Sequence, residues 1–158
     1  MANATIKIQG LKSLEKRLKR LSEQTVQDVK LQVLDSATQI EQDAISNAPN
    51  FLFIMGKKSG PESISVAQFI NKTPSNNGFA FDVGIEANTP IPIYVEFGTG
   101  TDAASYVPTL PKEVQAAARK FYKNGKGRIM KQPYLIPAFL KESPLFIAEL
   151  KKILKKNV

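Results

Sequence analysis

The chain has 158 residues, 42% hydrophobic content and a formal net charge of +8, which fits one ordinary globular domain. It contains no cysteine and no histidine. Disulfides, thiolate metal sites and cysteine nucleophiles are therefore excluded, and so is the commonest general base. The longest uninterrupted apolar run, Phe51–Met55, is far shorter than the ~20 residues that span a bilayer. Since the first residues also lack a signal-peptide pattern, we expect no membrane partner.

The charge is uneven along the chain. Residues 1–35 carry +3, residues 36–111 carry −4 and residues 112–158 carry +9. A basic block beside an acidic one is typical of a protein that contacts nucleic acid. It is equally typical of charge-complementary docking between copies or with a partner. A solvated lysine-rich surface would give the same count, so the charge alone leaves these three interpretations open.

Apolar spacing predicts the first elements. Residues 5–9 alternate polar and apolar side chains, which predicts a short strand that ends at Gly10. Leu11, Leu14, Leu18 and Leu21 then form one helical stripe. A second stripe predicts a long helix over about residues 23–47, since Pro49 disfavours helical geometry at the residue before it. The apolar positions of this second stripe are Val26, Val29, Val33, Ala37, Ile40, Ala44 and Ala48.

A loop and a hairpin are predicted next. We assign residues 49–62 to a loop because proline and glycine flank the apolar run Phe51–Met55. An exposed run of this kind marks an interface, which is the interpretation we favour over folding back into the core. Residues 63–85 read as a β-hairpin, with alternating apolar residues on both sides of the turn signal Asn76-Asn77-Gly78.

The remaining elements are read from glycine and proline positions. Tyr94–Phe97 reads as the end of a strand, followed by a Gly-Thr-Gly turn at 98–100. Pro111 suits the first turn of a helix over about residues 111–123. Ser143 and Pro144 suit the start of a final helix over about residues 144–156.

These elements predict one domain over residues 1–158. Its class is α+β, in which a long N-terminal helix and C-terminal helices pack on a small, mainly antiparallel β-sheet.

Candidate chemistry is sparse. The Gly98-Thr99-Gly100 turn lacks the lysine and hydroxyl residue of a Walker motif, so it does not predict a nucleotide site. Glu86 and Glu96 could form a carboxylate pair of the glycosidase kind, but the chain has no tryptophan for a sugar platform. We therefore expect no enzyme activity, no cofactor and no metal.

Several segments together resemble one family, the tail-completion or tail-component proteins in the neck of long-tailed bacteriophages with lambda-like tails. The shared features are a Gly-Leu-x-x-Leu helix start at 10–14, Ala48-Pro49, and Ser63-Ile64. The most specific are Tyr-Val-Glu-Phe-Gly-Thr at 94–99 and Gln-Pro-Tyr-Leu-Ile-Pro-Ala at 132–138. The chain departs from the family pattern in the apolar segment 50–62 and in the longer stretch 101–131.

The resemblance implies a structural protein of the virion neck or tail, assembled in the host cytoplasm. Copies would form a ring, expected to be hexameric, between the head-closure complex and the tail tube, around packaged DNA that is contacted without sequence specificity. Tail-terminator or tail-tube proteins would be further partners. The expected subunit or partner contacts are Phe51, Leu52, Phe53, Ile54, Met55, Glu96, Phe97, Thr99 and Tyr134. The expected contacts with channel DNA or an acidic partner are Arg119, Lys120, Lys123, Lys126, Arg128 and Lys131.

Two other interpretations stay open. A stand-alone nucleic-acid-binding protein would use the basic residues at 112–131, with binding that falls steeply as salt rises. A neighbouring neck component, such as the tail terminator or the head-closure protein, has similar size and setting. The match at 94–99 favours tail completion over both of these neck components.

Overall fold

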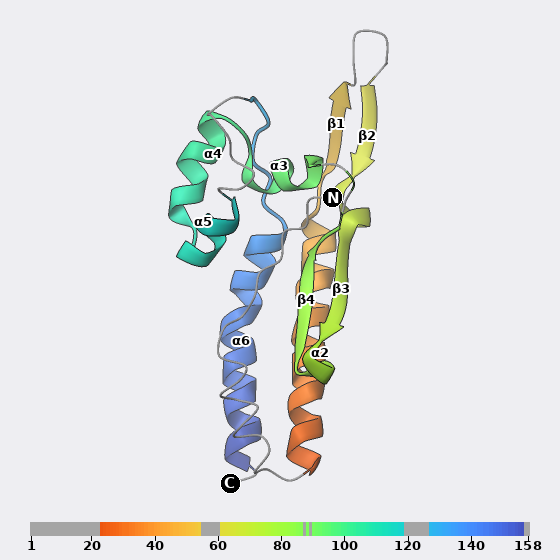
Figure 1. Ribbon diagram of the computed structural model, residues 1–158, viewed down its shortest axis with the longest axis vertical. Helices are drawn as coiled ribbons and strands as arrows, with labels where there is room; N and C mark the ends of the chain where they lie inside the picture. The colour runs from red at the N-terminus through yellow and green to blue at the C-terminus, as the bar shows by residue number, and fades with distance from the viewer. Residues whose placement is uncertain (1–22, 55–60, 87, 89, 119–126, 157–158) are drawn as a thin grey trace.

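The computed structural model describes residues 23–54, 61–86, 88, 90–118 and 127–156. The expected strand at 5–9, the leucine stripe of residues 11–21 and Met55 lie outside these ranges. Element labels follow Figure 1.

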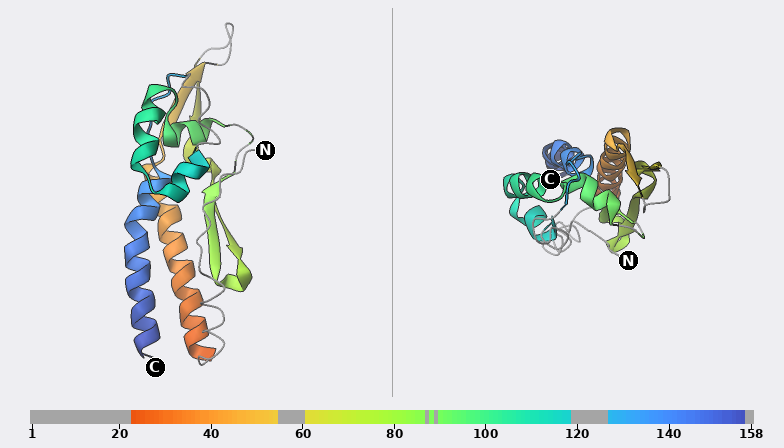
Figure 2. Two further views of the ribbon diagram at one scale, coloured as in Figure 1. Left: turned by 60° about the vertical axis from the view of Figure 1, so that its left-hand side comes forward. Right: turned by 90° about the horizontal axis from the view of Figure 1, so that it is seen from above.

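Two long helices form the frame of the molecule. Helix α2 (Glu23–Asn47) and helix α6 (Leu135–Lys156) lie side by side and run in opposite directions (Figures 1 and 2). At 1.5 Å per residue they are about 37 Å and 33 Å long. The predicted end of α2 is confirmed, since the helix stops two residues before Pro49 as the proline rule requires. Its first described residue, Glu23, is where the described range begins.

The predicted start of the final helix is wrong, since α6 begins at Leu135 rather than near Pro144. Pro137 lies in the first turn, where a residue has no intrahelical acceptor for an N–H group, so its missing donor costs nothing. Pro144 lies inside the helix and leaves the carbonyl of Leu140 without its helical donor. Leu140 is on the exposed side of α6, where water can satisfy that carbonyl.

Two antiparallel hairpins accompany the helices in the described part of the chain. Strand β1 (Asn50–Ile54) pairs with β2 (Pro61–Ser65), and β3 (Ile70–Ser75) pairs with β4 (Ala80–Ile85). The β3–β4 hairpin lies along α2, whereas β1 and β2 extend beyond the end of that helix (Figure 1). The loop assignment of residues 51–54 is therefore wrong, because pairing with a distant segment supplies ladder hydrogen bonds that sequence spacing does not reveal.

The predicted turn of the second hairpin is confirmed. Asn76, Asn77 and Gly78 all have positive φ, at 49°, 54° and 84°, a conformation that asparagine and glycine tolerate best. The first arm of the predicted hairpin is interrupted by the 3-10 turn η1 (Val66–Phe69), so only residues 70–75 pair with β4.

Short helices close one end of the frame. They are α3 (Ile91–Phe97), α4 (Thr101–Tyr106), the 3-10 turn η3 (Val107–Thr109) and α5 (Lys112–Ala118). The strand predicted at Tyr94–Phe97 is wrong. Pro90 and Pro92 set helical φ values at its start, and the Tyr94 N–H donates to the Pro90 carbonyl at 3.0 Å. The helix predicted at 111–123 is confirmed up to Ala118, where the described segment ends.

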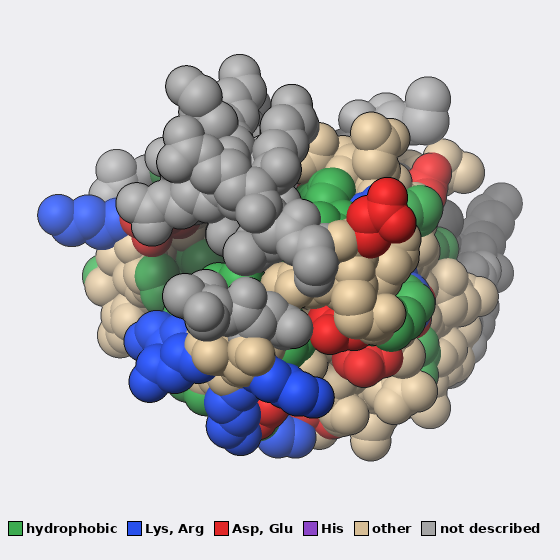
Figure 3. Space-filling model, turned by 90° about the horizontal axis from the view of Figure 1, so that it is seen from below, with side chains coloured by type: hydrophobic (Ala, Val, Ile, Leu, Met, Phe, Trp, Pro, Cys, Tyr) green, Lys and Arg blue, Asp and Glu red, His purple; other side chains and the backbone are tan. Residues whose placement is uncertain are grey.

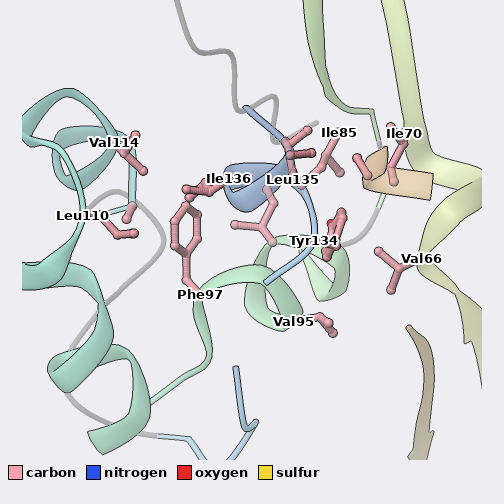
Figure 4. Close-up of a cluster of buried hydrophobic side chains, with 14 of the residues drawn as sticks. Val66, Ile70, Ile85, Val95, Phe97, Leu110, Val114, Tyr134, Leu135 and Ile136 are labelled. Carbon is pink, nitrogen blue, oxygen red and sulfur yellow. The ribbon is translucent and has the colours of Figure 1, made fainter. Parts of the chain in front are cut away.

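The core lies where these short helices, β3, β4 and the start of α6 meet (Figure 4). Its largest fully buried side chains include Ile93, Val95, Val66, Tyr134 and Ile136. This arrangement of long helices on a small antiparallel sheet confirms the predicted α+β class.

A polar contact fixes how α2 and α6 align. The Ser36 hydroxyl donates to Oε1 of Glu142 at 2.8 Å, and both side chains are buried. Nearby, Lys141 pairs with Asp43 at 2.6 Å. A buried hydrogen-bonded carboxylate stabilises one register of the two helices because sliding either helix would leave it without its donor.

We predict that Ser36→Ala destabilises the chain by about 1–3 kcal/mol, because a buried carboxylate loses a donor. The double variant Ser36→Ala/Glu142→Leu should lose less than the single variant, since no buried charge is left without its partner. Urea unfolding measures both free energies. A double variant less stable than Ser36→Ala would contradict this account of the pair.

Candidate functional site

The carboxylate of Glu96 binds the start of α6. Its side chain is only 1% exposed. Oε2 accepts hydrogen bonds from the backbone N–H groups of Tyr134 at 2.8 Å and Leu135 at 2.9 Å, and Oε1 accepts one from Ile136 at 3.0 Å. The first N–H groups of a helix have no partner within the helix, and a negative charge there also complements the helix dipole. Glu96 therefore caps α6 from helix α3.

Backbone contacts extend this cap along the chain. The Gln132 N–H donates to the Val95 carbonyl at 2.7 Å, and the Thr99 N–H donates to the Ile129 carbonyl at 2.9 Å. The Ile129 N–H donates to Oγ1 of Thr99 at 2.8 Å, and the Lys131 N–H donates to the Asp102 carboxylate. We call this unit, Val95–Asp102 bound to Ile129–Ile136, the Glu96 clasp.

The Gly-Thr-Gly turn lets the two halves of the clasp approach closely. Gly98 has a φ of +75°, and a Cβ atom there would lie 3.1 Å from the Lys131 nitrogen and 3.2 Å from the Ile129 oxygen. Only glycine fits both the conformation and the space. The close backbone neighbour of this turn is thus another segment of the same chain.

Burial shifts the pKa values of three titratable groups in and beside the clasp. Burial raises the pKa of the Glu96 carboxyl, and the three N–H groups oppose that rise. The Tyr134 hydroxyl donates to the Pro92 carbonyl at 3.0 Å, and burial, followed by the charge of Glu96, raises the pKa of this phenol. The same two causes raise the pKa of Tyr106 to about 12. Both phenols therefore stay protonated and serve as neutral groups.

The structure corrects part of the expected interface. Glu96, Phe97 and Tyr134 are buried inside the chain, so their assignment as partner contacts is wrong. They were selected from a motif, and a motif does not distinguish a partner-binding residue from one that builds the core. Thr99 is half-buried, and its hydroxyl accepts the hydrogen bond from Ile129. Phe51, Leu52, Phe53 and Ile54 lie in β1, and their interface contacts stay a prediction.

The expected basic contacts are only partly described. Arg119, Lys120, Lys123 and Lys126 lie outside the described residues. Lys131 pairs with Asp102 at 3.3 Å and lies over the Tyr106 ring at 5.5 Å, so it contributes to the clasp. Arg128 is exposed.

A second basic surface lies at the end of α6. Its lysines 151, 152, 155 and 156 are exposed, and Figure 3 shows Lys and Arg side chains gathered at that end of the molecule. In the sequence these lysines read as a complement to the helix dipole, and only the structure shows that they share one exposed surface.

The two carboxylates considered for catalysis take separate partners. Glu86 is exposed and accepts a hydrogen bond from Asn71 at 2.5 Å, whereas both oxygens of Glu96 are occupied in the clasp. Within the described ranges no three carboxylates are grouped so as to hold a metal ion. Of the helices described, none has the length and apolar composition needed to cross a membrane.

Comparison of the chain with protein-family models, with curated proteins and with solved structures finds no match. The site is therefore interpreted from its own geometry.

We predict that Glu96→Gln destabilises the chain by about 1–3 kcal/mol, because an amide nitrogen replaces one acceptor oxygen against the N–H groups of α6. The effect should depend on pH. Since burial raises the pKa of Glu96 in the folded state above its ordinary value of 4.5, the stability contributed by this group is greatest below pH 4.5. It falls as pH rises through the folded pKa.

The difference in unfolding free energy between wild type and Glu96→Gln should therefore narrow as pH rises above 4.5. Urea unfolding at a series of pH values measures it. A difference that widens as pH rises would mean that the three N–H groups lower the pKa of Glu96 by more than burial raises it.

Gly98→Ala should destabilise the clasp more than Gly78→Ala destabilises the hairpin turn. Both glycines have positive φ, so alanine is strained at both, by about 1 kcal/mol. At Gly78 the nearest atom to a new Cβ is 3.7 Å away on the flexible Lys30 side chain, whereas at Gly98 backbone atoms lie at 3.1 and 3.2 Å. Thermal or urea unfolding of the two variants makes the comparison, and equal losses would rule out close packing as the reason for Gly98.

Proposed function

We propose that this chain is a structural subunit of the neck of a long-tailed bacteriophage. Copies would form a ring that joins the head-closure complex to the tail tube around the DNA channel. The proposal rests on the tail-completion resemblance, and the site geometry supports it.

One observation carries the proposal. The two most specific segments of the resemblance are 94–99 and 132–138. The residues that bond across them are 38 to 40 positions apart in the sequence. The two segments meet through the three hydrogen bonds of Glu96. Segments that contact each other in this way form one structural unit. Glu96 is the only acid in 94–99, and both of its carboxylate oxygens cap α6. This use suits a protein that works by holding a shape.

The surface also suits an assembly protein. Large apolar side chains are exposed on both long helices, among them Leu31, Ile45, Leu140 and Ile147, and Met130 is exposed within the clasp. Where such side chains line one face of a helix, they supply apolar surface for a contact with another protein.

A second candidate is a basic protein that binds nucleic acid by itself. The four exposed lysines near the end of α6 favour it, because lysine side chains bind phosphate by charge. Within a neck ring the same lysines could face DNA or an acidic partner.

We predict that the purified chain forms rings of one size, seen by native mass spectrometry and negative-stain electron microscopy. Antibody labelling should place it at the neck of the virion, between the head-closure and tail-tube proteins. A monodisperse monomer that never enters particles would refute the proposal.

The same samples distinguish the neck subunit from the second candidate, a protein that binds nucleic acid by itself. A monomer that binds duplex DNA tightly at about 50 mM salt, and loses affinity steeply as salt rises, would indicate an independent nucleic-acid-binding protein.

A further inference from the structure

Helices α2 and α6 each carry exposed apolar side chains in a stripe. The α2 stripe consists of Leu31, Leu34 and Ile45, and the α6 stripe consists of Leu140 and Ile147. These side chains are between 36% and 57% exposed, although leucine and isoleucine are usually buried. Each stripe needs an explanation because neither is covered within the described part of the chain.

The two stripes point away from each other. Ser36 and Glu142 mark the faces on which α2 and α6 touch. A helix turns by 100° per residue, so Leu31 lies about 140° around α2 from Ser36. On α6, Ile147 lies about 140° and Leu140 about 160° from Glu142. The stripes are therefore on opposite sides of the helix pair, and one copy cannot bring them together.

One residue of each stripe lies at the same height along the pair. Because α2 and α6 are antiparallel and touch at Ser36 and Glu142, a residue five before Ser36 is level with a residue five after Glu142. These residues are Leu31 and Ile147. A neighbour related by rotation about an axis parallel to the helices would keep these heights, and could place its Ile147 against Leu31.

The charges beside the stripes are opposite in sign. On α2, Asp35 and Asp28 lie about 40° and 60° around the helix from Leu31, and on α6, Lys151 and Lys155 lie about 40° and 80° from Ile147. Asp35 and both lysines are exposed, and Asp28 is partly exposed. Lys and Arg side chains gather at this end of the molecule, with Asp or Glu side chains among them (Figure 3), and Lys152 pairs with Glu149 there at 2.5 Å. Each apolar stripe is therefore flanked by charge that attracts the other.

We propose that the α2 stripe of one copy docks against the α6 stripe of the next copy of this chain. The contact is heterologous, since it joins two different surfaces, and such contacts close into rings when the rotation allows it. Apolar burial provides the affinity, and the aspartate and lysine side chains set the register and exclude the reverse pairings. This inference rests on the proposed ring and names the surfaces that form it.

Cysteine crosslinking tests the contact directly, because the chain has no cysteine of its own. In the double variant Leu31→Cys/Ile147→Cys, mild oxidation should link each copy to two neighbours and give a ladder that ends at the ring size. Each single variant should stay unlinked at the interface, since it presents one thiol to a leucine or isoleucine. The matched control is Leu31→Cys/Leu145→Cys. Leu145 is also exposed on α6, at 53%, but lies about 160° around the helix from Ile147, so no ladder is expected.

Charge reversal gives an independent readout. Lys151→Glu/Lys155→Glu should abolish rings, and so should Asp28→Lys/Asp35→Lys, because each variant then places like charges on both surfaces. Mixing the two variants should restore rings of alternating subunits, seen by native mass spectrometry. Rings that neither variant weakens, or a mixture that stays unassembled, would overturn the proposal.

The outcomes separate this contact from the ring itself. Wild-type rings with no ladder from Leu31→Cys/Ile147→Cys would refute these surfaces and leave the neck subunit in place. A wild-type chain that stays monomeric and is absent from virions would refute both.

Residues 1–22 of the same chain are the competing occupant of the α6 stripe. A disulfide within one chain in Leu14→Cys/Ile147→Cys would show that they cover the α6 stripe, and would overturn docking by a second copy.

Discussion

The hydrogen bonds from the first turn of α6 to the buried Glu96 carboxylate are the constraint on which the rest of the structure depends. They join α3 to α6, and the backbone contacts at Val95, Thr99 and Asp102 extend the junction along residues 129–132. Burying a carboxylate is costly unless it is hydrogen-bonded. The helix α6 therefore begins where its first backbone N–H groups can donate to Glu96. The start of α6 then determines which residues face α2, and with them the Ser36–Glu142 contact.

This arrangement changes the interpretation of Glu96, the acid within the segment 94–99. A glutamate beside a glycine-rich turn resembles a ligand-binding or catalytic group, but here both of its oxygens accept backbone hydrogen bonds in a site that excludes water. The two glycines of the turn are likewise explained by the backbone geometry at the junction. Exposed apolar side chains such as Leu31 and Ile147 lie elsewhere, on the outward faces of the long helices, away from the residues that carry the motif.

The clasp and these outward faces are nevertheless linked. If residues one position along the chain bound the Glu96 carboxylate instead, α6 would be rotated by about 100°, and the side that carries Leu140 and Ile147 would no longer face away from α2. The Glu96 clasp therefore sets the direction of a surface that lies up to three turns away along α6.

Local signals alone determined the end of α2, the positive-φ turn at Asn76–Gly78 and the α+β class. Each depends on residues that are close in sequence. For α2 these are apolar residues spaced three or four apart, followed by Pro49, and for the turn they are two asparagines and a glycine. Only the tertiary structure decided that Phe51–Ile54 is a strand, that Tyr94–Phe97 is helical, and that α6 begins at Leu135. The strand needs its partner at 61–65, and the start of α6 needs an acceptor 38 to 40 residues away. Spacing along a sequence does not record partners that folding brings together. For that reason the sequence predicts Glu96 as a partner contact, whereas its hydrogen bonds place it inside the chain.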